Sequence, residues 1–119
     1  QRRELENYFA RPYLLVKFAK LLHFKYDKFS SSQLEQAMNE AIEDYTLRAY
    51  LNDLNHIWWN TAKLSDDWLD IIFPEFYKQL NLPLGFYKRD YYQLIGLMDV
   101  KDMSSEIVEK LDLIYEVLK

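Results

Sequence analysis

The sequence predicts an all-α fold, a compact single-domain bundle of five to seven helices. The chain has only two glycines and three prolines in 119 residues, whereas an all-β chain needs turn residues about every 8–12 positions. Apolar residues recur at the three- and four-residue spacing of amphipathic helices along most of the chain. Half of the residues are hydrophobic and 17% are aromatic, which suffices for the core of one domain.

The N-terminal part of the chain predicts three helical segments. Residues 2–10 fit a short helical turn, and Pro12 fits the first turn of the next helix, where its missing N–H costs no hydrogen bond. The spacing of the following apolar residues continues that helix to about Tyr26. Ser32 and Glu35 have the spacing of a capping box, which predicts a helix from there to about Tyr50.

The middle of the chain contains several breaks between helical segments. Asn52, Asp53 and Asn55 predict a break, because short polar side chains compete for backbone hydrogen bonds. We expect Ser65 to cap the helix that follows the tryptophan pair, with acidic residues in its first turn. Pro74 lies within an apolar run, and we expect it to begin a new helix rather than to lie inside one.

The C-terminal third predicts a loop and two further helices. Residues 81–85, Asn-Leu-Pro-Leu-Gly, form the clearest loop signal. A helix is expected from Tyr87 to Met98, weakened by Gly96. The last expected helix, residues 104–118, has an uninterrupted apolar stripe.

The composition excludes several classes of protein. Cysteine is absent, so disulfides, thiol nucleophiles and cysteine-bound zinc are excluded, and we predict a cytoplasmic location. No apolar run reaches the ~18 residues that a membrane span requires. The chain begins with Gln1 rather than Met, and we expect it to be a fragment or module of a larger protein.

Charge is unevenly distributed along the chain, whose formal net charge is −4. Residues 1–30 carry seven Lys and Arg against three acids, whereas residues 31–76 carry two against nine. The sequence therefore predicts a polarised molecule with a basic N-terminal quarter and an acidic middle.

The sequence provides little support for catalysis. Asp53 and His56 have the spacing of half a metal site, but a complete site needs more ligands than this chain offers in that pattern. Serines 30–32 lie at a helix start, where serine has a structural role. Phosphate-binding loops need clustered glycines, which the chain lacks. We therefore predict a protein that is not an enzyme and has no metal or cofactor.

The most aromatic stretch, residues 45–80, contains all three tryptophans. Adjacent residues on a helix point about 100° apart, so we expect one of Trp58 and Trp59 in the core, together with Ile71, Ile72 and Phe73. The other tryptophan either packs against a neighbouring helix or anchors a partner protein. The predicted partner surface consists of one of these tryptophans and the nearby acids Asp53, Asp66, Asp67 and Asp70.

A basic and aromatic helix face is the alternative binding site. On a helix that begins at Pro12, one stripe combines lysines with rings: Tyr13, Lys17, Lys20, Phe24 and Lys28. Lys88 and Arg89 lie beside further tyrosines in the sequence and form a second group of basic and aromatic residues. Single-stranded nucleic acids bind through phosphate contacts and stacking on such side chains, although the sequence pI of about 5.1 is low for that class. A solvated lysine face is the simpler interpretation.

These observations favour a non-catalytic helical binding module. We expect it to recognise a protein partner through the acidic and aromatic surface of the middle segment. The alternative is an accessory domain of a replication or transcription protein that binds single-stranded nucleic acid or a nucleotide through the basic and aromatic N-terminal helix.

Overall fold

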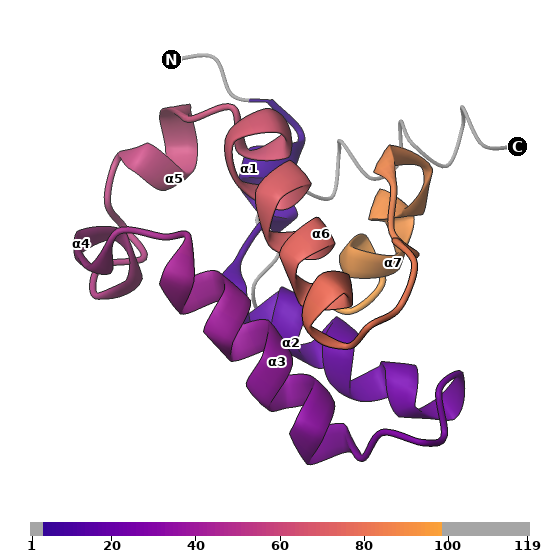
Figure 1. Cartoon of the computed structure of the whole chain (residues 1–119). Coiled ribbons are helices and arrows are strands. Elements are labelled where there is room, and N and C mark those ends of the chain that lie inside the picture. The colour runs from indigo at the N-terminus through magenta and orange to yellow at the C-terminus, as the bar shows by residue number, and fades with distance from the viewer. Residues whose placement is uncertain (1–3, 99–119) are drawn as a thin grey trace, which may run out of the picture.

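The computed structural model describes residues 4–98, and this part of the chain is helical and contains no strand (Figure 1). The all-α class is therefore confirmed. Its α-helices are α1 (Glu6–Phe9), α2 (Pro12–Leu21), α3 (Ser31–Asp44), α4 (Arg48–Leu51), α5 (Trp58–Thr61), α6 (Asp70–Gln79) and α7 (Tyr91–Ile95). Three further helical turns are η1 (Leu22–Phe24), η2 (Ser65–Leu69) and η3 (Lys88–Asp90). The expected helix at 104–118 lies outside the described residues.

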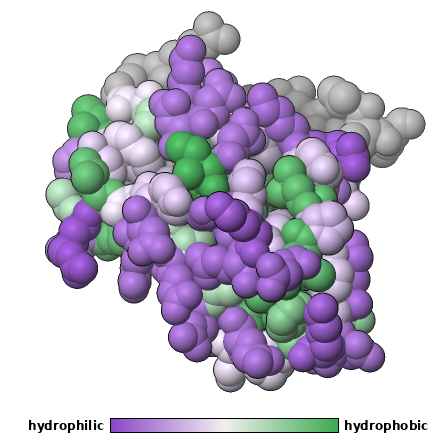
Figure 2. Space-filling view, in the orientation of Figure 1, coloured by the Kyte–Doolittle hydropathy of each residue, from purple (hydrophilic) through white to green (hydrophobic). Residues whose placement is uncertain are grey.

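The core lies between α2, α3 and α6. Helix α3 packs against both α2 and α6, while α7 contacts α2 and the short α4 and α5 lie to one side (Figure 1). The three long helices bury large apolar side chains against one another, including Leu14, Leu15, Met38, Ile72 and Phe76. Each such side chain stabilises the fold by about 1.5–3 kcal/mol when fully buried. Figure 2 shows polar residues over much of the surface, with hydrophobic areas over α4–α5, over α6 and beside α7.

Two tryptophans form a second, hydrogen-bonded part of the core. Trp59 and Trp68 are both fully buried, and their rings meet edge to face with centroids 5.1 Å apart. The Trp59 indole donates to the Tyr50 carbonyl at 2.9 Å, and the Trp68 indole donates to the Thr46 hydroxyl at 2.8 Å. Burial of an indole without such an acceptor would cost free energy. This pairing therefore holds the connection between α3 and α5 in place.

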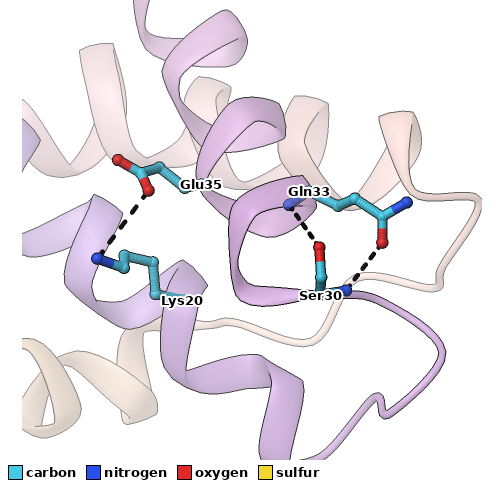
Figure 3. Close-up of polar contacts among 4 residues, drawn as sticks. All are labelled: Lys20, Ser30, Gln33 and Glu35. Carbon is cyan, nitrogen blue, oxygen red and sulfur yellow. Dashed lines mark hydrogen bonds and ion pairs between the residues drawn. The ribbon is translucent and has the colours of Figure 1, made fainter.

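Two helix starts differ from the prediction. Helix α3 is capped by Ser30 and Gln33, not by Ser32 and Glu35: the Ser30 hydroxyl accepts from the Gln33 N–H at 3.1 Å, and the Gln33 side chain accepts from the Ser30 N–H at 2.8 Å (Figure 3). Ser30 has the extended backbone that a cap requires, whereas Ser32 already lies within the helix. Ser65 does not cap a helix, because its hydroxyl pairs with that of Tyr91 at 2.6 Å.

Several predicted helices are shorter in the structure. Helix α3 ends at Asp44 rather than near Tyr50, and the turn after it brings Thr46 and Tyr50 to the indoles of the buried tryptophans. Helix α2 ends at Leu21, and η1 follows it. The helix predicted from Tyr87 consists of η3 and α7 and ends before Gly96.

Pro74 lies inside α6, which corrects the prediction of a new helix there. The turn before α6 is wide, with the Asp70 N–H bonded to the Ser65 carbonyl five residues earlier. Ile72, Phe73 and Phe76 are buried on both sides of the proline, and this packing keeps the helix continuous despite the missing hydrogen bond. Ile71, which we expected in the core, is 42% exposed.

Candidate interaction surface

The two adjacent tryptophans differ in burial. Trp59 is fully buried, so it belongs to the core and cannot contact a partner. Trp58 is half-buried and stacks on Tyr50, with ring centroids 4.4 Å apart and planes 7° from parallel. Asp53 lies nearby in the exposed turn between α4 and α5, where its carboxylate accepts from the Asn55 N–H at 3.0 Å. Of the two predicted anchors, only Trp58 reaches the surface.

The other predicted acids, Asp66, Asp67 and Asp70, are exposed on η2 and at the start of α6. Within residues 4–98, no hydrogen bond, ion pair or ring contact joins any of them to Trp58. Asp66 instead forms an ion pair with Lys88 at 3.6 Å. The predicted residues therefore come from two parts of the fold, Asp53 and Trp58 from the turn before α5 and from α5 itself, and the three other acids from η2 and the start of α6. Among residues 4–98, the acids of the second part make no direct contact with Trp58.

The second part gains acids from α1 and from the residues before it. Glu4, Glu6 and Asp66 line a small pocket of about 150 Å³ together with Lys63, Ser65 and Lys88. Burial raises the pKa of the Tyr91 hydroxyl, and the charges of Asp70, Glu6 and Asp66 raise it further against the opposing hydrogen bond from Ser65. Acids on α1, η2 and α6 thus all lie close enough to Tyr91 to raise the pKa of its hydroxyl.

A hydrophobic pocket adjoins these acids. It has a volume of about 280 Å³ and lies between α6 and the segment that leads into α7. Its base includes Phe86, which is buried and stacks on Phe73 at 3.8 Å between ring centroids, while Leu84 and Tyr87 remain exposed at its edge. The lining residues are Leu69, Asp70, Phe73, Pro74, Leu84, Phe86, Tyr87, Lys88 and Tyr91.

A second pocket, of about 230 Å³, is also lined by Asp70 and Pro74. Its other lining residues are Tyr45, Ile71, Glu75 and Lys78. The Tyr45 hydroxyl donates to the Glu75 carboxylate at 3.2 Å, and this hydrogen bond together with the charge of Glu75 raises the pKa of Tyr45. Because Asp70 and Pro74 line both pockets, we treat the two as one feature, the α6 groove.

The predicted basic and aromatic stripe is not continuous. Tyr13, Lys17 and Lys20 lie on α2, but Phe24 lies in η1 and Lys28 in the turn after it, so the helical spacing no longer applies. Lys20 pairs with Glu35 of α3 at 4.0 Å (Figure 3). The Lys28 ammonium lies 5.1 Å from the Phe29 ring, and Phe24 is 79% exposed.

The two predicted basic groups line different pockets. Lys17 and Lys20 line a pocket of about 460 Å³ with Leu21, Gly96, Leu97 and Met98, and the Lys17 ammonium donates to the Leu97 carbonyl at 3.3 Å. Lys88 instead lines both the pocket of Glu4 and Glu6 and the α6 groove. The Arg89 guanidinium lies 4.7 Å from the Tyr87 ring.

His56 has a local structural role. Its Nδ1 accepts the Trp58 backbone N–H at 3.1 Å at the start of α5, and its ring lies 4.9 Å from that of Tyr50. Across residues 4–98, no group of three or more His, Asp or Glu side chains is placed to hold a metal ion. The Asp53 and His56 pair is therefore not part of a larger ligand cluster in this part of the chain.

Several residues that line the pocket of Glu4 and Glu6 or the α6 groove could not be recognised in the sequence. Glu4 and Glu6 lie in the N-terminal quarter, whose excess of Lys and Arg concealed them. Leu84 and Tyr87 were assigned to a loop and to a helix start, and only the fold brings them beside α6. The one available signal was Pro74, a proline within an apolar run that has helical spacing.

The α6 groove combines exposed apolar side chains with carboxylates, a composition that suits reversible binding of another molecule.

Within the described range, no helix has the length and hydrophobicity to cross a membrane. No protein-family model, curated protein or solved structure matches this chain.

Proposed function

We propose that the chain is a non-catalytic helical binding module of a cytoplasmic protein, and that it recognises a protein partner through the α6 groove. One observation carries the proposal: Asp70 and Pro74 line two adjoining pockets, each of which has exposed apolar or aromatic side chains at its edge. Binding surfaces commonly combine an apolar centre with a polar rim.

The charges around the groove favour a basic partner. Asp70 lines both pockets, and Asp67 lies three residues before it on η2; both are exposed and have no ion-pair partner among residues 4–98. The lysines that line the groove, Lys78 and Lys88, are paired with Glu75 and Asp66. An unpaired carboxylate at the edge of an apolar pocket attracts a cation and raises the rate of association. The apolar side chains Ile71, Leu84 and Tyr87 then supply the area that is buried on binding.

The nucleic-acid alternative has one supporting observation, the pocket that Lys17 and Lys20 line between α2 and the residues after α7. Phe24 and Lys28 lie beyond the end of α2, so helical spacing no longer aligns them with Lys17 and Lys20. This weakens the alternative, because stacking platforms must accompany the phosphate contacts. The ion pair of Lys20 with Glu35 further reduces its positive charge.

The proposal is tested by titrating the protein into a short fluorescein-labelled peptide in which arginine alternates with leucine, here the Arg peptide. We expect saturable binding that weakens with salt and falls about tenfold or more in Asp67→Lys/Asp70→Lys. The matched control is Glu40→Lys/Glu43→Lys, which changes the net charge equally at exposed α3 positions that do not line the α6 groove.

Equal binding by both double variants would contradict the proposal, because net charge rather than the groove would then explain the affinity. A labelled oligothymidylate serves as the second probe. Saturable, salt-sensitive binding that is lost in Lys17→Glu/Lys20→Glu, without any binding of the Arg peptide, would favour the nucleic-acid alternative.

A further inference from the structure

The turn between α2 and α3 exposes two apolar side chains on one face. Phe24 in η1 is 79% exposed, and no other large apolar side chain among residues 4–98 is more exposed. Leu21, at the end of α2, is 48% exposed and lies three residues earlier, which places it about one helical turn away on the same face. Neighbouring apolar side chains that remain exposed within a polar surface mark a site of interaction.

Three exposed lysines flank this apolar pair: Lys20 in α2, and Lys25 and Lys28 in the turn after η1. The ammonium groups of the last two lie 5.4 and 5.1 Å from the rings of the residues that follow them. Glu35 pairs with Lys20 at 4.0 Å, and Asp27 is exposed in the same turn. Positive charge therefore exceeds negative charge around the pair.

The turn lies away from the acids of the α6 groove. In Figure 1 it is at lower right, where α2 leads into α3, while α1 and the beginning of α6 are near the top. Glu4, Glu6, Asp66 and Asp70 belong to that upper part or to the residues next to it. A negatively charged surface can therefore meet the turn without meeting these four acids.

We propose that this turn is a separate interaction surface, which attaches the protein to the surface of an anionic lipid bilayer. Phe24 and Leu21 enter the boundary between headgroups and acyl chains, while Lys25 and Lys28 contact the anionic headgroups around them. Attachment of this kind requires no helix that crosses the membrane. The proposal is independent of the partner protein that we assign to the α6 groove.

A bilayer fits these residues better than a nucleic acid or a folded protein does. Bases stack on aromatic rings, but the aliphatic side chain of Leu21 beside Phe24 offers them no such contact. A folded partner would need a pocket shaped for a protruding ring, whereas the boundary region of a bilayer accommodates apolar side chains of any shape. Burial of apolar area and attraction of lysines to headgroups are the two forces that bind proteins to anionic bilayers.

The test is co-sedimentation of the protein with vesicles of phosphatidylcholine, either alone or mixed equally with phosphatidylserine. We expect binding to the mixed vesicles that weakens with salt, and much weaker binding to the neutral ones. Phe24→Ser should lower the partition coefficient about tenfold, because the buried apolar area is lost. Lys25→Glu/Lys28→Glu should lower it by more than about tenfold.

The matched controls change exposed residues on other elements. Leu47→Ser removes an apolar side chain that is 64% exposed before α4. Arg48→Glu/Lys63→Glu changes the net charge as much as Lys25→Glu/Lys28→Glu does. Both controls should bind the mixed vesicles within about threefold of wild type, because unpaired surface charges far from the bilayer are screened by salt. Circular dichroism confirms that each variant keeps its helices.

Insertion is measured with a polarity-sensitive dye on a single introduced cysteine, since the chain has none of its own. The dye on Leu21→Cys should shift its emission to the blue when mixed vesicles are added, whereas the dye on Leu47→Cys should not. Absence of vesicle binding at low salt, or equal binding by wild type, Phe24→Ser and Lys25→Glu/Lys28→Glu, would overturn the proposal. Binding of oligothymidylate that Phe24→Ser abolishes, without vesicle binding, would also overturn it and assign the turn to nucleic acid.

Discussion

The tryptophan cluster and the α6 groove contain similar side chains arranged for different purposes. In the cluster, Trp59 and Trp68 are fully buried and each indole N–H has an acceptor within 2.9 Å. In the groove, Tyr45 and Tyr87 lie exposed at the edge, and the exposed Asp70 carboxylate has no ion-pair partner among residues 4–98. We therefore assign stability to the region whose indole N–H groups are all hydrogen-bonded within the protein, and we place binding in the region that leaves the Asp70 carboxylate exposed.

The largest expected effect on stability comes from a substitution within the tryptophan cluster. We predict that Trp59→Ala lowers the free energy of unfolding by about 3–5 kcal/mol, because it opens a cavity and leaves the Tyr50 carbonyl without its donor. Trp58→Ala should cost clearly less, since Trp58 is only half-buried. Urea denaturation followed by circular dichroism measures both losses. Equal losses of stability would contradict the difference in burial between Trp58 and Trp59.

The next effect is a loss of stability at alkaline pH that arises in the core. Burial raises the pKa of the Tyr77 hydroxyl far above its usual value of 10.0, with smaller contributions from Tyr26 and Asp90. Above pH 10 the unfolded chain loses this proton while the folded chain keeps it, so the free energy of unfolding falls by up to about 1.4 kcal/mol per pH unit. Below pH 10 the effect is absent.

Tyr77→Phe should remove this component of the pH dependence. Urea unfolding between pH 8 and pH 11 is the measurement, and a slope above pH 10 that is unchanged in Tyr77→Phe would assign it to other groups. Tyr77→Phe keeps the ring, which packs closely on Gly85: a Cβ added at residue 85 would lie 3.1 Å from it. The variant therefore removes the hydroxyl without removing this contact.

A smaller effect tests the start of α3. We expect Ser30→Ala to lower the free energy of unfolding by about 1 kcal/mol, because it removes the acceptor of the Gln33 N–H. Ser32→Ala, the residue that the sequence favoured as the cap, should change stability by less than about 0.5 kcal/mol. Thermal or urea unfolding measures both losses. A larger loss of stability in Ser32→Ala than in Ser30→Ala would support Ser32 as the cap, as the sequence predicted.

The smallest expected effect on stability belongs to the groove. Asp70→Asn should leave the free energy of unfolding within about 0.5 kcal/mol of wild type, because the side chain is exposed and has no ion pair among residues 4–98. It should nevertheless weaken binding of the Arg peptide, since the carboxylate charge is lost. A large loss of stability would mean that Asp70 serves the fold rather than a partner.

Much of the fold follows from local sequence signals. The apolar spacing predicted the helices of the core, and Pro12 begins α2 as its position suggested. The helix ends were harder to predict because tertiary hydrogen bonds set them. The Trp68 indole needs Thr46 and the Trp59 indole needs Tyr50, so α3 stops at Asp44 although the residues after it are compatible with a helix.

The candidate site was only partly predictable for similar reasons. The acids of η2 and α6 were visible in the sequence, but the rule that adjacent helical residues diverge could not decide which tryptophan is buried. Charge counted along the chain concealed Glu4 and Glu6, which lie beside Asp66 only after folding. The stripe from Tyr13 to Lys28 assumed one straight helix, and that assumption is wrong after Leu21.

The most direct test of the proposed difference between the two regions is one titration of the Arg peptide with Asp70→Asn and Trp58→Ala side by side. We predict that Asp70→Asn weakens binding about tenfold, whereas Trp58→Ala leaves the dissociation constant unchanged, because Trp58 stacks on Tyr50 and lies outside the α6 groove. Normal binding by Asp70→Asn together with loss of binding by Trp58→Ala would contradict this account and place the partner surface on α4 and α5.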